Sequence, residues 1–135
     1  MALDYGEARI GVAVSDPTGV FARPLETIAA RGRGAAPVNR IATLVREYDV
    51  GRIVVGLPLR FDGSSGSQAE RSRAFGARVA RRTGLPVDFF DERWSSEQAR
   101  RALRDTGVPA RKQKGRVDPI AASLILQAWM DREAM

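Results

Sequence analysis

The sequence predicts an α/β fold: a mixed five-stranded sheet, three strands antiparallel and two added in parallel, with helices on both faces. The short, mostly apolar segment Met1–Tyr5 and the alternating segment Arg9–Ser15 flank a short glycine turn, as in a β-hairpin. Arg52–Leu57 is a nearly continuous apolar run, typical of a parallel strand buried on both faces. Helical periodicity precedes each later strand, and the 135 residues favour one domain, residues 1–135.

A third antiparallel strand is expected at Val20–Ile28. Asp16–Gly19 is a strong turn signal that separates it from the second strand. Pro24 cannot donate a backbone hydrogen bond, so it predicts an edge position or a bulge.

Two helix–strand units should follow. After an expected basic loop at Ala29–Pro37, they are predicted at Asn39–Tyr48 with Arg52–Leu57, and at Gln68–Thr83 with Val87–Asp91. Crossover connections of this kind place consecutive strands in parallel.

The last part of the chain predicts two helices around a cationic loop. Ser95 and Gln98 fit a capping box, which begins a helix that runs to about Asp105. Residues Gly107–Arg116 are expected to be a loop. Asp118 followed by Pro119 then fits the N-cap and first position of the final helix.

Composition narrows the chemistry. The net charge of +6 and the pI of about 10.9 favour polyanionic partners, nucleic acid first, although 20 of the 22 basic residues are arginine, as a GC-rich genome would also produce. The chain has no histidine and no cysteine. A Ser-His-Asp triad, histidine-ligated zinc and thiolate chemistry are therefore excluded.

No apolar stretch is long enough to span a membrane, and the N-terminus lacks the pattern of a signal peptide. We therefore expect a cytoplasmic location with no membrane partner.

Three carboxylates at the ends of apolar segments are the main catalytic candidates: Asp4, Glu92 and Asp118. If the fold brings them together, they would repel one another unless a cation such as Mg²⁺ or Mn²⁺ lay between them. Each also has a structural alternative. Asp4 could form a turn, Glu92 could pair with Arg93, and Asp118 could act as a helix cap.

The cationic segment beside Asp118 is the candidate for phosphate binding. It holds Lys112, Lys114 and Arg116, and its alternative is a solvated run of charge. Arg93, next to Glu92, is a further candidate contact to substrate.

Taken together, these residues resemble the YqgF/RuvX family. Four motifs in matching order carry the resemblance: Leu3–Gly6 with Arg9–Asp16; Val55–Leu59 with Asp62–Gly63; Asp91–Arg93 with Ser95–Ser96; and Val117–Asp118 with Ala121–Ala122 and Ile125–Gln127. The resemblance implies an RNase H-like fold, with Asp4, Glu92 and Asp118 as catalytic metal ligands and the Gly56–Pro58 turn beside them.

The family is described both as nucleases that process pre-16S rRNA and as Holliday junction resolvases. The expected function is therefore metal-dependent hydrolysis of phosphodiester bonds at the 5′ end of pre-16S rRNA, with the precursor of the small ribosomal subunit as a partner and a monomer favoured over a homodimer. The alternatives are a junction resolvase, which should be a symmetric dimer, a non-catalytic RNA- or ribosome-binding module, and a sugar-kinase-like phosphotransferase.

Overall fold

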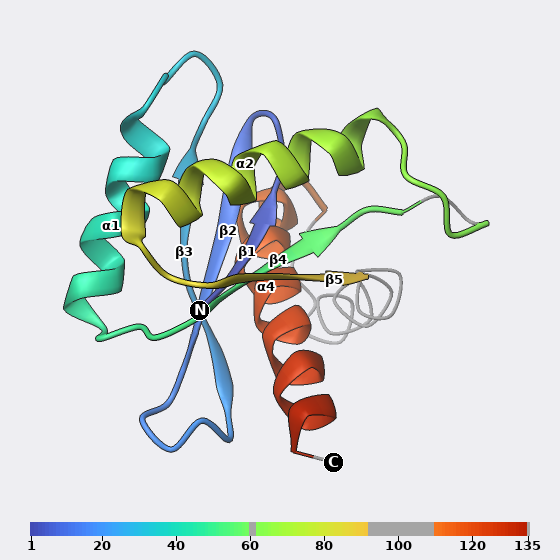
Figure 1. The fold of residues 1–135 in the computed structure, drawn as a ribbon. Helices are drawn as coiled ribbons and strands as arrows, with labels where there is room; N and C mark the ends of the chain where they lie inside the picture. Colours follow the sequence, from blue (N-terminus) through green and yellow to red (C-terminus); the bar gives the residue numbers. More distant parts are fainter. Residues whose placement is uncertain (60–61, 92–109, 135) are drawn as a thin grey trace.

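The computed structural model describes residues 1–59, 62–91 and 110–134, and of residues 110–117 it describes the backbone alone. Its strands are β1 (Ala2–Tyr5), β2 (Arg9–Ser15), β3 (Ala22–Ala29), β4 (Ile53–Leu57) and β5 (Val87–Asp91). They form one sheet in the order β3-β2-β1-β4-β5 (Figure 1). The β1–β2 and β2–β3 pairs are antiparallel, and the β1–β4 and β4–β5 pairs are parallel. The predicted mixed five-stranded sheet is confirmed.

Strand β3 lies at the edge of the sheet and carries the predicted irregularity. The register with β2 shifts between Val12 and Ala13, which pair with Glu26 and Pro24. Leu25 is the extra residue of this bulge. A proline is tolerated here because an edge strand does not need all of its N–H groups.

The helices lie in two layers on either side of the sheet. They are α1 (Ala36–Glu47), α2 (Ser67–Thr83) and α4 (Ala110–Glu133). Figure 1 shows α1 and α2 on one face and α4 on the other. Helix α1 begins three residues before the predicted Asn39, because Pro37 occupies its first turn, where a missing N–H costs little.

Each face of the sheet has its own apolar core. Towards α1 and α2 the sheet presents large side chains, which pack against buried residues of both helices: Leu3, Ile10, Val12, Ile53 and Val55 from the sheet, with Ile41, Leu44, Phe75 and Val79 from the helices. Towards α4 it presents smaller ones: Ala2, Ala13 and Val54, together with Phe90, against Ala122, Ile125 and Leu126.

The predicted start of the last helix is wrong. Helix α4 begins at Ala110, so Asp118 is not its N-cap and Pro119 lies inside it. The segment expected to be a cationic loop is therefore helical from Ala110 onward. Its Arg, Lys and Gln residues are good helix formers, and they outweigh the local signal of Asp-Pro, although Pro119 removes one hydrogen bond from the helix. The predicted helix at Ser95–Asp105 and residues 107–109 lie outside the described residues.

None of the helices within the described residues is long and apolar enough to cross a bilayer.

Gly11 allows α4 to approach the sheet closely. A Cβ atom built on Gly11 would lie 2.0 Å from the carbonyl oxygen of Asp118 and 2.8 Å from the nitrogen of Pro119. Both are backbone atoms, which cannot rotate away as a flexible side chain could. The backbone of α4 therefore rests on β2 at a point where only glycine fits.

We predict that Gly11→Ala destabilises the protein by about 3 kcal/mol or more, because the added methyl group forces α4 away from the sheet. Gly51→Ala is the matched control, since a Cβ at Gly51 meets nothing within 4 Å. Urea unfolding monitored by circular dichroism measures both changes. Equal free energies of unfolding for the two variants would contradict the close contact.

Candidate active site

The candidate site lies at the edge of the sheet where three parallel strands end. Strands β1, β4 and β5 run in the same direction and finish at Tyr5, Leu57 and Asp91. Asp4 is the penultimate residue of β1, which is the central strand of the five-stranded sheet. Val55 pairs with Leu3, so the Gly56–Pro58 turn follows at the level of Asp4, as the family resemblance implies.

The side chain of Asp4 belongs to the face of the sheet that carries α4. Side chains alternate along a strand, and Ala2, two residues earlier, packs in the α4 core. Leu3, between them, packs in the opposite core. Asp4 also pairs directly with Gly11 of β2, and directly opposed residues of antiparallel strands share a face.

Asp118 reaches the same place from the helix. Its carbonyl oxygen lies against Gly11, the residue that pairs with Asp4. Asp4 therefore lies beside Gly11 within the sheet, and the backbone of Asp118 lies over Gly11 on the same face. Two of the three acids that the sequence singled out are therefore neighbours of the same residue, Gly11.

Arg9 is the cationic partner of Asp118. Its Nε donates a hydrogen bond to Oδ2 of Asp118 over 3.0 Å, and the two side chains are 41% and 20% exposed. Arg9 lies two residues from Gly11 in β2, so both belong to the α4 face. Arg9 was not among the site residues predicted from the sequence. The sequence did hold a clue: Arg9, Gly11 and Ala13 are spaced two residues apart in one predicted strand, so their side chains share a face.

Burial and Arg9 act in opposite directions on Asp118. Burial is the larger effect and raises the pKa of the Asp118 carboxyl above its usual value, and the charge and hydrogen bond of Arg9 lower it only in part. Arg9 alone therefore does not fully compensate the charge of this carboxylate. A further cation at the site would favour its ionised form.

The structure does not describe the side chains of the other predicted site residues. Asp91 belongs to the opposite face of β5 from Phe90, which packs in the α4 core. Glu92 and Arg93 lie outside the described residues, and the side chains of Lys112, Lys114 and Arg116 do as well. Within the described ranges no three His, Cys, Asp or Glu side chains gather closely enough to hold a metal ion.

The turn between β1 and β2 is braced by α2. The rings of Tyr5 and Phe75 lie 4.6 Å apart, and Nε2 of Gln68 donates to the carbonyl oxygen of Tyr5 over 3.4 Å. Arg71 pairs with Glu7 at 3.3 Å. These contacts fix the end of β1, and therefore Asp4, against the helix on the other face.

The site is thus a carboxylate site on an α/β sheet, with oxygen donors from a strand and from a helix. Among solved structures, the fold is similar to that of Thermus thermophilus RuvC bound to a Holliday junction substrate, with a TM-score of 0.54 and 17% identity over 97% of this chain and 92% of that one. RuvC from the same organism in a second structure gives a TM-score of 0.51 over 98% and 94% of the two chains. The expected RNase H-like fold is confirmed.

The chain belongs to the RuvX family. The family model described as "RuvX: Holliday junction resolvase" matches residues 1–132. Two relatives named "Putative pre-16S rRNA nuclease" agree: one from Anaeromyxobacter sp. (strain Fw109-5) is 49% identical over 97% of this chain and 95% of its own length. The other, from Pelotomaculum thermopropionicum, is 44% identical over 98% of this chain and 86% of its own length.

We predict that Asp118→Asn makes the metal-free protein more stable at pH 7. The raised pKa means that the folded state disfavours the ionised carboxyl, and this loss of stability grows as the pH rises through the folded-state pKa. The neutral amide of asparagine removes this loss of stability, which should raise Tm in EDTA by roughly 1–3 °C. Asp131→Asn, an exposed acid farther along α4, should leave Tm nearly unchanged. A lower Tm for Asp118→Asn in EDTA would show that its ion pair with Arg9 outweighs burial.

Proposed function

We propose that this protein is a metal-dependent nuclease that hydrolyses phosphodiester bonds at the 5′ end of pre-16S rRNA. The observation that carries the proposal is that Asp4 and Asp118 are both neighbours of Gly11 on one face of the sheet, in a chain of the RuvX family. Without histidine or cysteine, the chain has carboxylates as its best groups for this chemistry.

The donors at the site fit Mg²⁺ or Mn²⁺. Both ions prefer oxygen ligands, and Asp4 and Asp118 supply carboxylate oxygens from two rigid elements. Glu92 follows directly after the last residue of β5, and we assign it as the third ligand. When bound, the ion would lower the pKa of a water molecule and neutralise charge at the phosphate.

The remaining residues would position the catalytic groups and the substrate. Arg9 holds the carboxylate of Asp118 in one orientation. The first turns of α4, with Lys112, Lys114 and Arg116, lead directly to Asp118. We propose that these cations, with Arg93, contact the phosphates near the scissile bond, which gives affinity without reading the sequence.

The names of the relatives support pre-16S rRNA as the substrate, and with it a cytoplasmic enzyme that meets the precursor of the small ribosomal subunit. The family description favours a second candidate, resolution of branched DNA. A resolvase cuts two strands symmetrically and would act as a two-fold dimer, whereas RNA trimming requires only the monomer that we propose.

We predict that the protein cleaves a labelled 16S precursor 5′ leader in Mn²⁺ or Mg²⁺, and that EDTA abolishes cleavage. Asp4→Asn should lower the rate on the order of 10³-fold, since loss of groups that merely support metal ligands already costs up to about 10²-fold. The RNA should still bind, because its phosphate contacts remain.

The control is Asp131→Asn, which removes the same charge from an exposed position of α4. A synthetic four-way junction is assayed beside the leader. Symmetric cleavage of the junction alone would make the protein a resolvase. Tight binding of RNA with no metal-dependent cleavage of either substrate would leave a binding module and overturn the proposal.

A further inference from the structure

The exposed face of α2 is a row of arginines. Arg71, Arg78 and Arg82 recur at intervals of seven and four residues, so they lie along one side of the helix, and Arg81 lies one turn after Arg78. All four are exposed. Ala74 and Ala77, also exposed, lie between them, and their small side chains leave the guanidinium groups accessible.

Most of this charge is not neutralised by the protein. Arg71 pairs with Glu7, but Arg78 donates only to the carbonyl oxygen of Gly34 over 3.4 Å, and Arg82 to Oδ1 of Asn39 over 3.2 Å. In the part of the chain that the structure describes, no carboxylate forms an ion pair with Arg78, Arg81 or Arg82.

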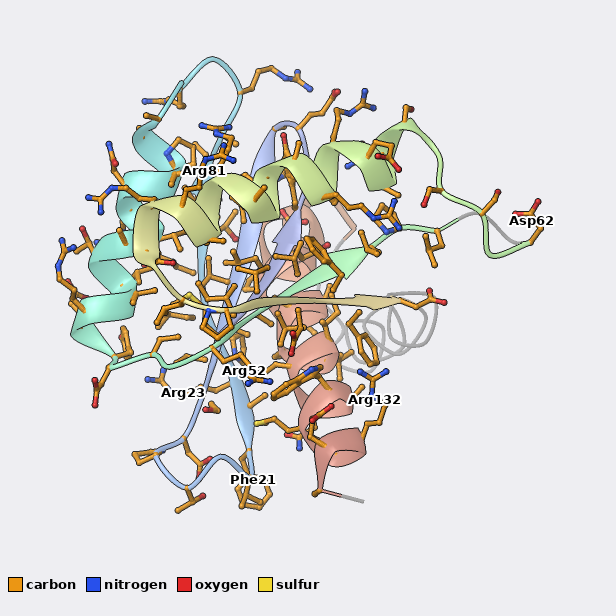
Figure 2. The ribbon with its side chains drawn as sticks, viewed as in Figure 1. Phe21, Arg23, Arg52, Asp62, Arg81 and Arg132 are labelled. Carbon is orange, nitrogen blue, oxygen red and sulfur yellow. The ribbon has the colours of Figure 1, made fainter. Side chains whose placement is uncertain are left out.

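The loop before α1 adds two cations to the same surface. Arg31 and Arg33 are exposed, and the bond from Arg78 to Gly34 holds this loop against α2. Figure 2 shows Arg81 at the end of α2 that lies beside α1. Arg31, Arg33, Arg78, Arg81 and Arg82 are called the arginine face below.

We propose that the arginine face binds the phosphate backbone of a nucleic-acid duplex, and that this duplex is the double-helical part of the substrate. The proposal rests on the nuclease function proposed above and assigns it a second binding surface, separate from the cations around Asp118. Unpaired guanidinium groups on a smooth helix face are suited to phosphate oxygens, which they bind through two hydrogen bonds at a time.

The lack of an exposed aromatic residue on α2 favours a duplex over a single strand on this helix. Proteins that bind single strands without sequence preference stack bases on aromatic rings. The one aromatic residue of α2, Phe75, is buried. From Arg71 to Arg82 the helix rises roughly 16 Å, which matches about five phosphate steps along a strand.

The arginine face leads towards the candidate active site. The first turns of α2 contact the β1–β2 turn through Gln68 and through the Arg71–Glu7 pair. That turn follows Tyr5, the residue after Asp4. A duplex lying along α2 would therefore extend from the arginine face to the edge of the sheet where the strand is cut.

The test compares two triple variants with equal loss of charge. Arg78→Gln, Arg81→Gln and Arg82→Gln remove the arginines from α2, and glutamine keeps the helix propensity. Arg23→Gln, Arg52→Gln and Arg132→Gln are the control. These three lie at the other end of the molecule in Figure 2, over the rings of Tyr48, Trp129 and Phe90.

Binding of an RNA duplex and of the same sequence as a single strand is measured in EDTA over a range of salt concentrations. The slope of log K against log salt reports the number of phosphate contacts, roughly 0.9 per contact on duplex. The α2 variant should lower this slope by about 2 to 3 for the duplex, and the control by less than about 1. The single strand should show a smaller change. Circular dichroism checks that both variants are folded.

Equal slopes for the two triple variants would show that only net charge matters and would overturn the proposal. An unchanged slope for the α2 variant, or an equal loss with the single strand, would do the same. Because EDTA prevents cleavage, failure of this inference is separate from failure of the nuclease function, which is read from wild-type cleavage in Mn²⁺.

Discussion

The contact between Gly11 and the backbone of Asp118 is the constraint on which the site depends. A β-strand and a helix can place their backbones this close only where the strand lacks a side chain. Gly11 also pairs with Asp4, so a single close approach fixes an acid of the helix beside an acid of the central strand. The small residues Ala2 and Ala13 extend the same close packing along the sheet.

The buried position of Asp118 carries an electrostatic cost that Arg9 offsets only in part. Arg9 pairs with Asp118, yet burial still raises the pKa of that carboxyl. A divalent cation beside Asp118 would favour its ionised form, and a cost to stability at a functional site is common in proteins. On the other face of the sheet, the arginines of α2 form a positive surface. We therefore propose that α2 attracts the nucleic acid, whereas β1 and α4 carry the acids that would cut its backbone.

The sheet could be predicted from the sequence because alternation and apolar runs report directly on strands, and β2 and β5 have the expected bounds. The start of α4 could not be predicted. Asp118 and Pro119 form a local signal for a helix start, but the helix propensity of the residues before them overrides it. Asp4 and Asp118 could be named as candidates, but their proximity depends on the β1–β2 register and on the packing at Gly11. The role of Arg9 depends on the same long-range contact.

The most direct test of the account is a crystal structure determined in the presence of Mn²⁺, with the ion located by its anomalous scattering. The account predicts an anomalous peak in contact with carboxylate oxygens of both Asp4 and Asp118, at roughly 2.2 Å, close to the distances that hard divalent ions take to oxygen. A fully ordered site in which Asp118 remains bound to Arg9 and Mn²⁺ is found only elsewhere would contradict it.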